Sequence, residues 1–103
     1  MSVQLLVIYP PPKDPAEFDR AYRSEHLPFA GPRLVGATGV TTKCVLGAPG
    51  GTPFAHWISV IDFPSVQAAR ACAQSNGGQE ALKHAASISS GGPPQFLLID
   101  DAA

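Results

Sequence analysis

The chain has 103 residues, of which 45% are hydrophobic and 15% are charged, and its formal net charge at pH 7 is −1. This length predicts one domain, 1–103, and leaves little room for a second. The seven Lys and Arg residues are scattered along the sequence, so it shows no basic patch typical of proteins that bind nucleic acid or anionic lipid.

The first expected element is a strand over Val3–Tyr9, an apolar run closed by three prolines that cannot continue a β-ladder. The run is too short to cross a membrane and lacks the basic flank and cleavage site of a signal peptide. Cys44 and Cys72 fit no metal-binding spacing and are expected to be free thiols in a reducing compartment. We therefore expect a cytoplasmic protein with no membrane partner.

A helix is expected to begin after Asp14, whose side chain can cap the first free N–H groups. Pro15 suits the first helical position, and Glu17 stands where a capping-box carboxylate belongs. Because a proline disfavours helical angles in the residue before it, Pro28 predicts that this helix ends near Leu27.

The remaining elements are expected in the order strand, strand, helix, short helix and strand, over residues 34–46, 54–63, 64–74, 79–86 and 95–99. A loop rich in Gly and Pro joins the two strands of the expected hairpin. Ser65 is the expected N-cap of the second helix, and the run Asn76-Gly77-Gly78 is expected to interrupt that helix.

The order β-α-β-β-α-β is that of the ferredoxin-like α+β fold, a four-stranded antiparallel sheet with both helices on one face. Both faces of the expected sheet are apolar: Val7 and Tyr9 point one way from the first strand, and Leu6 and Ile8 the other. A sheet with one face in water would alternate apolar and polar residues. A second copy, packed sheet to sheet into an α/β barrel, would cover the face without helices, so we expect a homodimer.

A stripe of side chains on the first expected helix contains the candidate catalytic residues. Phe18, Tyr22 and His26 recur at four-residue spacing and therefore face the sheet together, near Tyr9 at the end of the first strand. Phe18 has the character of a core residue, whereas a buried tyrosine or histidine needs a polar partner. A histidine with a pKa near 6.5 can exchange protons at neutral pH, and a tyrosine hydroxyl can donate to a developing oxyanion.

The other candidate residues and motifs give weaker indications of a functional site. His56 and Trp57 are neighbours in an expected strand and should lie on opposite faces, so at most one of them would line the same cavity. His84, near the polar residues of the second helix, is expected to be solvated. No phosphate-binding glycine motif appears, and no group of residues has metal-ligand spacing, so neither a cofactor nor a metal is expected.

The first-helix segment FDRAYRSEHLPFAGP resembles the EthD-like family of dimeric α/β-barrel proteins. The matching positions are Tyr9-Pro10, then Phe18, Tyr22, His26 and Pro28, then Gly36 and Gly39. The resemblance implies a dimer with a pocket in each subunit between helices and sheet. It also implies that His26 faces this pocket, with Tyr9 and Tyr22 nearby. The wider superfamily includes cofactor-free monooxygenases, lactone isomerases, polyketide cyclases, decarboxylases and haem-degrading enzymes.

The leading hypothesis is a cofactor-independent isomerase, cyclase, decarboxylase or monooxygenase acting on a small apolar or aromatic metabolite. Its expected catalytic residues are His26, as acid/base, and Tyr22; its expected pocket residues are Tyr9, Phe18, Phe29, His56 and Trp57. One alternative is a non-catalytic accessory or binding module, favoured by how few polar groups converge. A further alternative is haem binding through His26 as axial ligand, although no basic cluster is available for the propionates.

Overall fold

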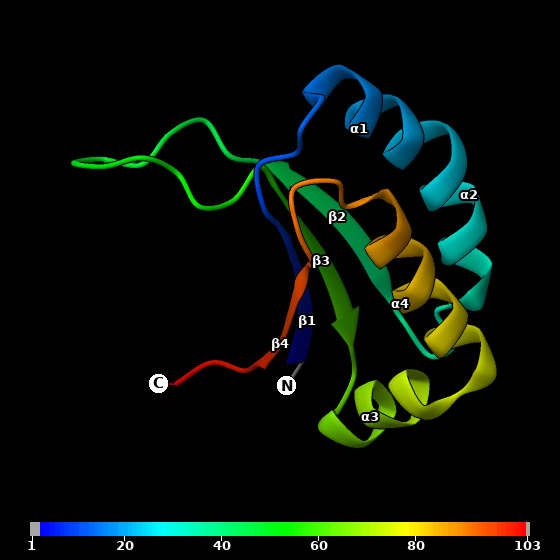
Figure 1. The fold of residues 1–103 in the computed structure, drawn as a ribbon. Coiled ribbons are helices and arrows are strands. Elements are labelled where there is room, and N and C mark those ends of the chain that lie inside the picture. The colour runs from blue at the N-terminus through cyan, green and yellow to red at the C-terminus, as the bar shows by residue number, and fades with distance from the viewer. Residues whose placement is uncertain (1–2, 103) are drawn as a thin grey trace.

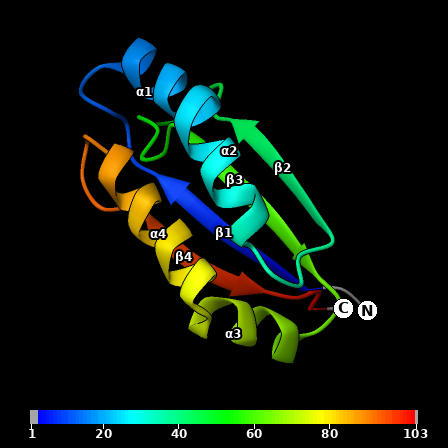
Figure 2. The ribbon, with the colours of Figure 1, turned by 90° about the vertical axis from the view of Figure 1, so that its right-hand side faces the viewer.

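The computed structural model describes residues 3–102, which form a four-stranded antiparallel sheet with helices on one face (Figures 1 and 2). The strands lie in the order β2-β3-β1-β4. Their bounds are Val3–Tyr9 for β1, Gly39–Cys44 for β2, Trp57–Phe63 for β3 and Gln95–Ile99 for β4. This order is that of the ferredoxin-like fold, so the expected α+β fold class is confirmed.

The hairpin strands β2 and β3 are shorter than expected. The chain leaves the ladder after Cys44 and returns to it at Trp57. The residues between them form a long arm that projects from the sheet on the side away from the helices (Figure 1). At the tip of the arm, Ala48 and Gly51 form an isolated bridge, and Gly50 adopts a φ of 77°, which favours glycine.

The first helical stretch is longer and less regular than expected. It comprises α1 (Pro15–Ala21), a π-helical turn η1 (Tyr22–His26), α2 (Leu27–Ala30) and a 3₁₀ turn η2 (Gly31–Arg33). Asp14 caps α1 as expected, accepting a hydrogen bond from the backbone N–H of Glu17 at 3.2 Å.

The prediction that this helix ends near Leu27 was wrong. The backbone N–H of Leu27 donates to the carbonyl of Tyr22, five residues back, which is the π-helical pattern. A new α-helical segment starts directly afterwards, and Pro28 occupies its first turn. Proline is tolerated at that position because the first turn of a helix does not use all its N–H groups.

The second pair of helices, α3 (Val66–Gln74) and α4 (Asn76–Ile88), is joined at one residue. Ser65 caps α3 as expected, and Ser75 caps α4 by accepting from the backbone N–H of Gly78 at 3.0 Å. The expected glycine break is therefore wrong, because the glycines form the first turn of α4. A Cβ at Gly78 would lie 1.8 Å from the carbonyl oxygen of Cys72, so the tight junction itself requires glycine.

The core lies between the sheet and the helices. Its members are Val3, Val7, Tyr9, Phe18, Tyr22, Trp57, Ile61, Phe63, Ala69, Cys72 and Ala85. Aromatic rings meet edge to face at its centre, with the Phe18 ring centroid 5.1 Å from that of Tyr9 and 5.5 Å from that of Trp57. Within residues 3–102, no helix is both long enough and apolar enough to cross a membrane.

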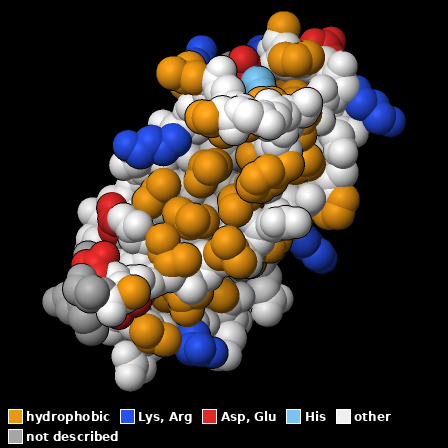
Figure 3. Space-filling model, turned by 90° about the vertical axis from the view of Figure 1, so that its left-hand side faces the viewer, with side chains coloured by type: hydrophobic (Ala, Val, Ile, Leu, Met, Phe, Trp, Pro, Cys, Tyr) orange, Lys and Arg blue, Asp and Glu red, His pale blue; other side chains and the backbone are white. Residues whose placement is uncertain are grey.

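The opposite face of the sheet carries no helix, and hydrophobic side chains spread across it (Figure 3). The strand register places six aliphatic residues there: Leu6, Ile8, Ile58, Val60, Leu97 and Ile99. Leu97 and Ile99 remain 48% and 38% exposed. The sheet is therefore apolar on both faces, as its sequence predicts.

The helix junction gives a test of the fold. Replacing a helical glycine with alanine normally stabilises a helix by about 1 kcal/mol. Gly78→Ala should instead lower the free energy of unfolding by about 2 kcal/mol, because the new methyl group overlaps the Cys72 carbonyl. Urea unfolding measures this. Gly51→Ala is the control, since its added methyl group meets nothing within 4 Å. A Gly78→Ala protein as stable as wild type would contradict the described junction.

Candidate functional site

A small cavity of about 70 Å³ lies between the sheet and the helices. Its polar side chains are those of Tyr9, Tyr22, His26 and Ser59, and every other lining residue is aliphatic or Gly31. The walls come from β1, β2, β3 and from the helical segments η1, α2 and α4 together with the residues that border them. The cavity is thus an apolar space in which a few polar groups converge, the usual character of a small-molecule site.

The π-helical turn places two of these groups. Tyr22 and His26 are its first and last residues, their side chains are 1% and 7% exposed, and their ring centroids lie 5.4 Å apart. Such turns insert an extra residue into a helix and occur frequently at functional sites.

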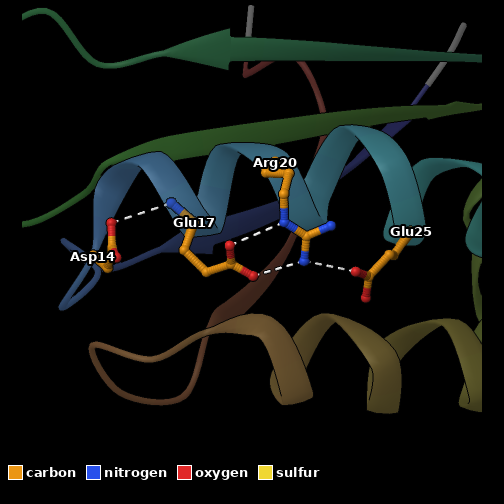
Figure 4. Close-up of polar contacts among 4 residues, drawn as sticks. All are labelled: Asp14, Glu17, Arg20 and Glu25. Atoms are coloured by element: carbon orange, nitrogen blue, oxygen red, sulfur yellow. Dashed lines mark hydrogen bonds and ion pairs between the residues drawn. The ribbon is translucent and has the colours of Figure 1, made fainter.

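On its outer side the turn is joined to α1 by an arginine (Figure 4). Arg20 donates to both carboxylate oxygens of Glu17, at 2.9 and 2.6 Å, and to Glu25 at 2.7 Å. All three side chains are about half exposed, so each pair contributes little stability by itself. Their role is geometric, since Arg20 connects the first turn of α1 with the π turn.

The hydroxyl of Tyr22 is bound to the sheet. It lies 2.6 Å from Oγ of Ser59 on β3 and 2.6 Å from Oγ1 of Thr42 on β2. A phenol has one proton to donate and can accept from the other partner, so both contacts can be satisfied together. Tyr22 therefore anchors the π turn across two strands.

His26 is held between two other side chains. Its Nε2 lies 3.4 Å from the hydroxyl of Tyr9, whose side chain is fully buried. Its Nδ1 lies 2.9 Å from Nδ1 of His84. The planes of the two imidazole rings differ by only 2°, and their centroids are 5.1 Å apart. Parallel rings whose atoms approach this closely lie edge to edge, which is the arrangement that an N–H···N hydrogen bond requires.

The expectation that His84 is solvated was wrong. It is half-buried, and its ring lies against that of Phe29, with 4.7 Å between centroids. The sequence contained a signal for this placement. Ala81, Ala85 and Ile88 mark the inward stripe of α4 at helical spacing, and position 84 belongs to the same stripe.

Four of the expected pocket residues lie outside the cavity: Phe18, Phe29, His56 and Trp57. The expectation that His56 and Trp57 point to opposite faces was also wrong. Their rings are nearly parallel, 5.7 Å apart, and both meet Phe18 edge to face. His56 precedes the first residue of β3, so strand alternation does not govern it, and its Nε2 lies 2.9 Å from Oδ1 of Asp19.

Burial determines the protonation states of His26 and Tyr9, the two cavity groups that contact each other. Burial, with neighbouring His84 as a second cause, lowers the pKa of His26 to about 4. Burial also raises the pKa of Tyr9, with the nearby Tyr22 hydroxyl as a second cause. At neutral pH, His26 is therefore a neutral imidazole and Tyr9 a neutral phenol. Among residues 3–102, no group of three or more His, Cys, Asp or Glu side chains could hold a metal ion.

No family model matches the chain, and no curated protein matches it either. Solved structures do. An EthD family protein from Bacillus halodurans has a TM-score of 0.86 at 18% identity, covering 98% of this chain and 99% of its own. A dimeric ferredoxin-like protein of unknown function from Jannaschia sp. has a TM-score of 0.69 at 16% identity, covering 98% and 100%.

SnoaB, a cofactor-independent oxygenase from Streptomyces nogalater, is also similar, with a TM-score of 0.66 at 14% identity, covering 99% of this chain and 94% of its own. At these identities, structural likeness establishes the fold and leaves the reaction open. The chain has the fold of EthD family proteins, as the motif in its first helix predicts.

Proposed function

We propose that this protein is a cofactor-independent enzyme that moves a proton on a small apolar or aromatic metabolite, with His26 as the acid/base. The observation that carries the proposal is the meeting of a buried neutral imidazole and a buried phenol at the wall of an apolar cavity. The likeness in fold to a cofactor-independent oxygenase supports the same class of chemistry.

The two groups have complementary roles. A neutral His26 can accept a proton from a carbon next to a carbonyl group of the substrate. Tyr9, kept protonated by burial, can donate a hydrogen bond to the oxygen on which negative charge develops. This pair suits the enolisation step shared by isomerases, cyclases, decarboxylases and some oxygenases. Tyr22 holds His26 in position through its bonds to the sheet.

The cavity volume limits the ligand. About 70 Å³ is less than the roughly 150 Å³ of an apolar cavity that binds benzene. An aromatic substrate would therefore enter only if the lining side chains Leu27, Leu34 and Val40 move. A haem is many times larger still, so the volume does not favour the haem alternative. The accessory alternative, binding without turnover, differs from the proposed enzyme in predicting no catalysed proton exchange.

We also propose that the protein is a homodimer that buries the open sheet face. The aliphatic side chains on that face support this proposal, as does the similarity to a ferredoxin-like protein described as dimeric. We propose further that residues 1–103 form one domain. Cys44 and Cys72 are both free, which agrees with a reducing, cytoplasmic setting.

A charge on the open face should separate the subunits. Leu6 lies on β1, between Val60 and Leu97 on the neighbouring strands, so Leu6→Glu places a carboxylate in the middle of the proposed interface. Light scattering after size exclusion should give a dimeric mass for wild type and a monomeric mass for Leu6→Glu. Lys83→Glu on the exposed side of α4 is the control and should remain dimeric. A monomeric wild type would refute the dimer.

Proton abstraction can be measured without knowing the physiological substrate. We expect the protein in D₂O to catalyse deuterium incorporation into some members of a panel of small aromatic ketones, lactones and phenols, followed by NMR. His26→Gln should slow this exchange by at least about 100-fold. His56→Gln, which alters a histidine outside the cavity, should leave the rate unchanged. Exchange no faster than in buffer across the panel would instead favour the accessory role.

Burial of neutral His26 also predicts how stability depends on pH. The pKa is 6.5 in the unfolded chain and about 4 in the folded one, so between these values only the unfolded state binds the proton. The free energy of unfolding should therefore be highest above pH 6.5 and should fall by roughly 3 kcal/mol as the pH drops to 4. In His26→Leu this dependence should be much weaker. Urea unfolding at several pH values measures it, and equal slopes in the two proteins would contradict the assignment.

A further inference from the structure

Outside the cavity lies a wider cleft of about 390 Å³, bordered by α1 and α4. Its lining includes His84, the carboxylates of Asp14, Glu17 and Glu25, and the cationic side chains of Lys13 and Arg20. His84 belongs to the wall of this cleft, whereas His26 belongs to the wall of the inner cavity. The two histidines therefore stand between the two spaces, bonded to each other through their Nδ1 atoms.

This bond restricts where the protons can be. Each nitrogen of a neutral imidazole either carries a hydrogen or accepts one. Since the two Nδ1 atoms are 2.9 Å apart, one of them must carry the hydrogen and the other accept it. When the hydrogen is on Nδ1 of His26, the Nε2 of the same ring carries no hydrogen and is an acceptor at the cavity wall, 3.4 Å from the Tyr9 hydroxyl.

A buried histidine alone would be a poor base. Taking a proton would create a cation in an apolar space, which is the reason that burial depresses its pKa. If the Nδ1 hydrogen crosses to His84 as Nε2 accepts the substrate proton, His26 remains neutral throughout. The positive charge then appears on His84, beside a cleft lined by three carboxylates and two cationic side chains.

We propose that His84 is the proton outlet of the site, connecting the inner cavity to the outer cleft through His26. The substrate C–H bond breaks and its electron pair remains on the substrate as an enolate, while an N–H bond forms at Nε2 of His26. The Nδ1 hydrogen of His26 moves to Nδ1 of His84, and His84 then releases its Nε2 proton to water in the cleft. No electrons are transferred, and the reverse sequence delivers a proton to the substrate.

The surroundings of His84 fix its ring for this task. Phe29 packs against it at an interplanar angle of 27°, and the guanidinium carbon of Arg33 lies 3.7 Å from the centroid of the Phe29 ring. Arg33 also donates to the backbone carbonyl of Phe29 at 2.8 Å. This packing keeps the His84 ring in the plane of the His26 ring. His84 acts through His26 and is therefore a positioning and relay residue.

The inference rests on the proposed acid/base role of His26, and a substrate-free measurement tests it independently. In wild-type protein with ¹⁵N-labelled histidine, the Nδ1 resonance of His26 should shift as the pH falls from about 8 to about 5, because the two rings share one hydrogen. In His84→Gln the amide can still form a hydrogen bond but cannot take up the proton, so this shift should disappear. A His26 Nδ1 resonance that stays constant over this pH range in wild type would overturn the relay.

Deuterium exchange supplies the second test. His84→Ala should slow exchange by about tenfold or more and leave a space open to the cleft. Added imidazole can occupy that space and carry the proton, so it should restore much of the lost rate, which a purely structural defect would not allow. An unchanged rate in His84→Ala, together with loss in His26→Gln, would refute the relay and leave the proposed function standing. Loss of exchange in His84→Ala without rescue would also refute the relay.

Discussion

The Tyr22 hydroxyl, bound at once to Ser59 and Thr42, is the contact on which the site depends. It ties the π-helical turn to two strands of the sheet and fixes the start of that turn. His26, at the end of the same turn, then points into the cavity and reaches Tyr9 from β1. In an uninterrupted α-helix, Pro28 would remove an interior hydrogen bond and kink or break the helix. The wider turn instead lets the chain continue as α2, whose residues close the cavity.

The two faces of the sheet carry different kinds of side chain. The helix-covered face holds buried polar groups, and these groups are satisfied by one another: none of the buried side-chain N or O atoms in the described part of the chain lacks a partner. The open face carries aliphatic side chains across three strands. Directional hydrogen bonds are therefore concentrated on the helix-covered face, whereas the open face offers apolar surface, whose burial is non-directional.

Much of this fold was predictable because its signals are local. The apolar run of β1, the caps Asp14 and Ser65, and the order of elements follow from neighbouring residues alone. The predictions were wrong where contacts between segments distant in the sequence determine the local structure. The π turn depends on contacts with β2 and β3, and the tight α3–α4 junction turns a glycine break into a helix start. The His26–His84 pair joins residues 58 positions apart, which no spacing rule within one helix could reveal.

The close approaches at glycine have a consequence for how variants of this protein would be interpreted. A Cβ at Gly91 would lie 1.9 Å from the carbonyl oxygen of Pro11, a clash as severe as the one at Gly78. Neither position lines the cavity. In a saturation library selected for activity, they would tolerate almost no replacement and would look as restricted as His26. These positions would reject other residues because of the backbone conformation, and His26 would do so because of its role in the site. Only a separate measurement of the amount of folded protein could distinguish the two causes.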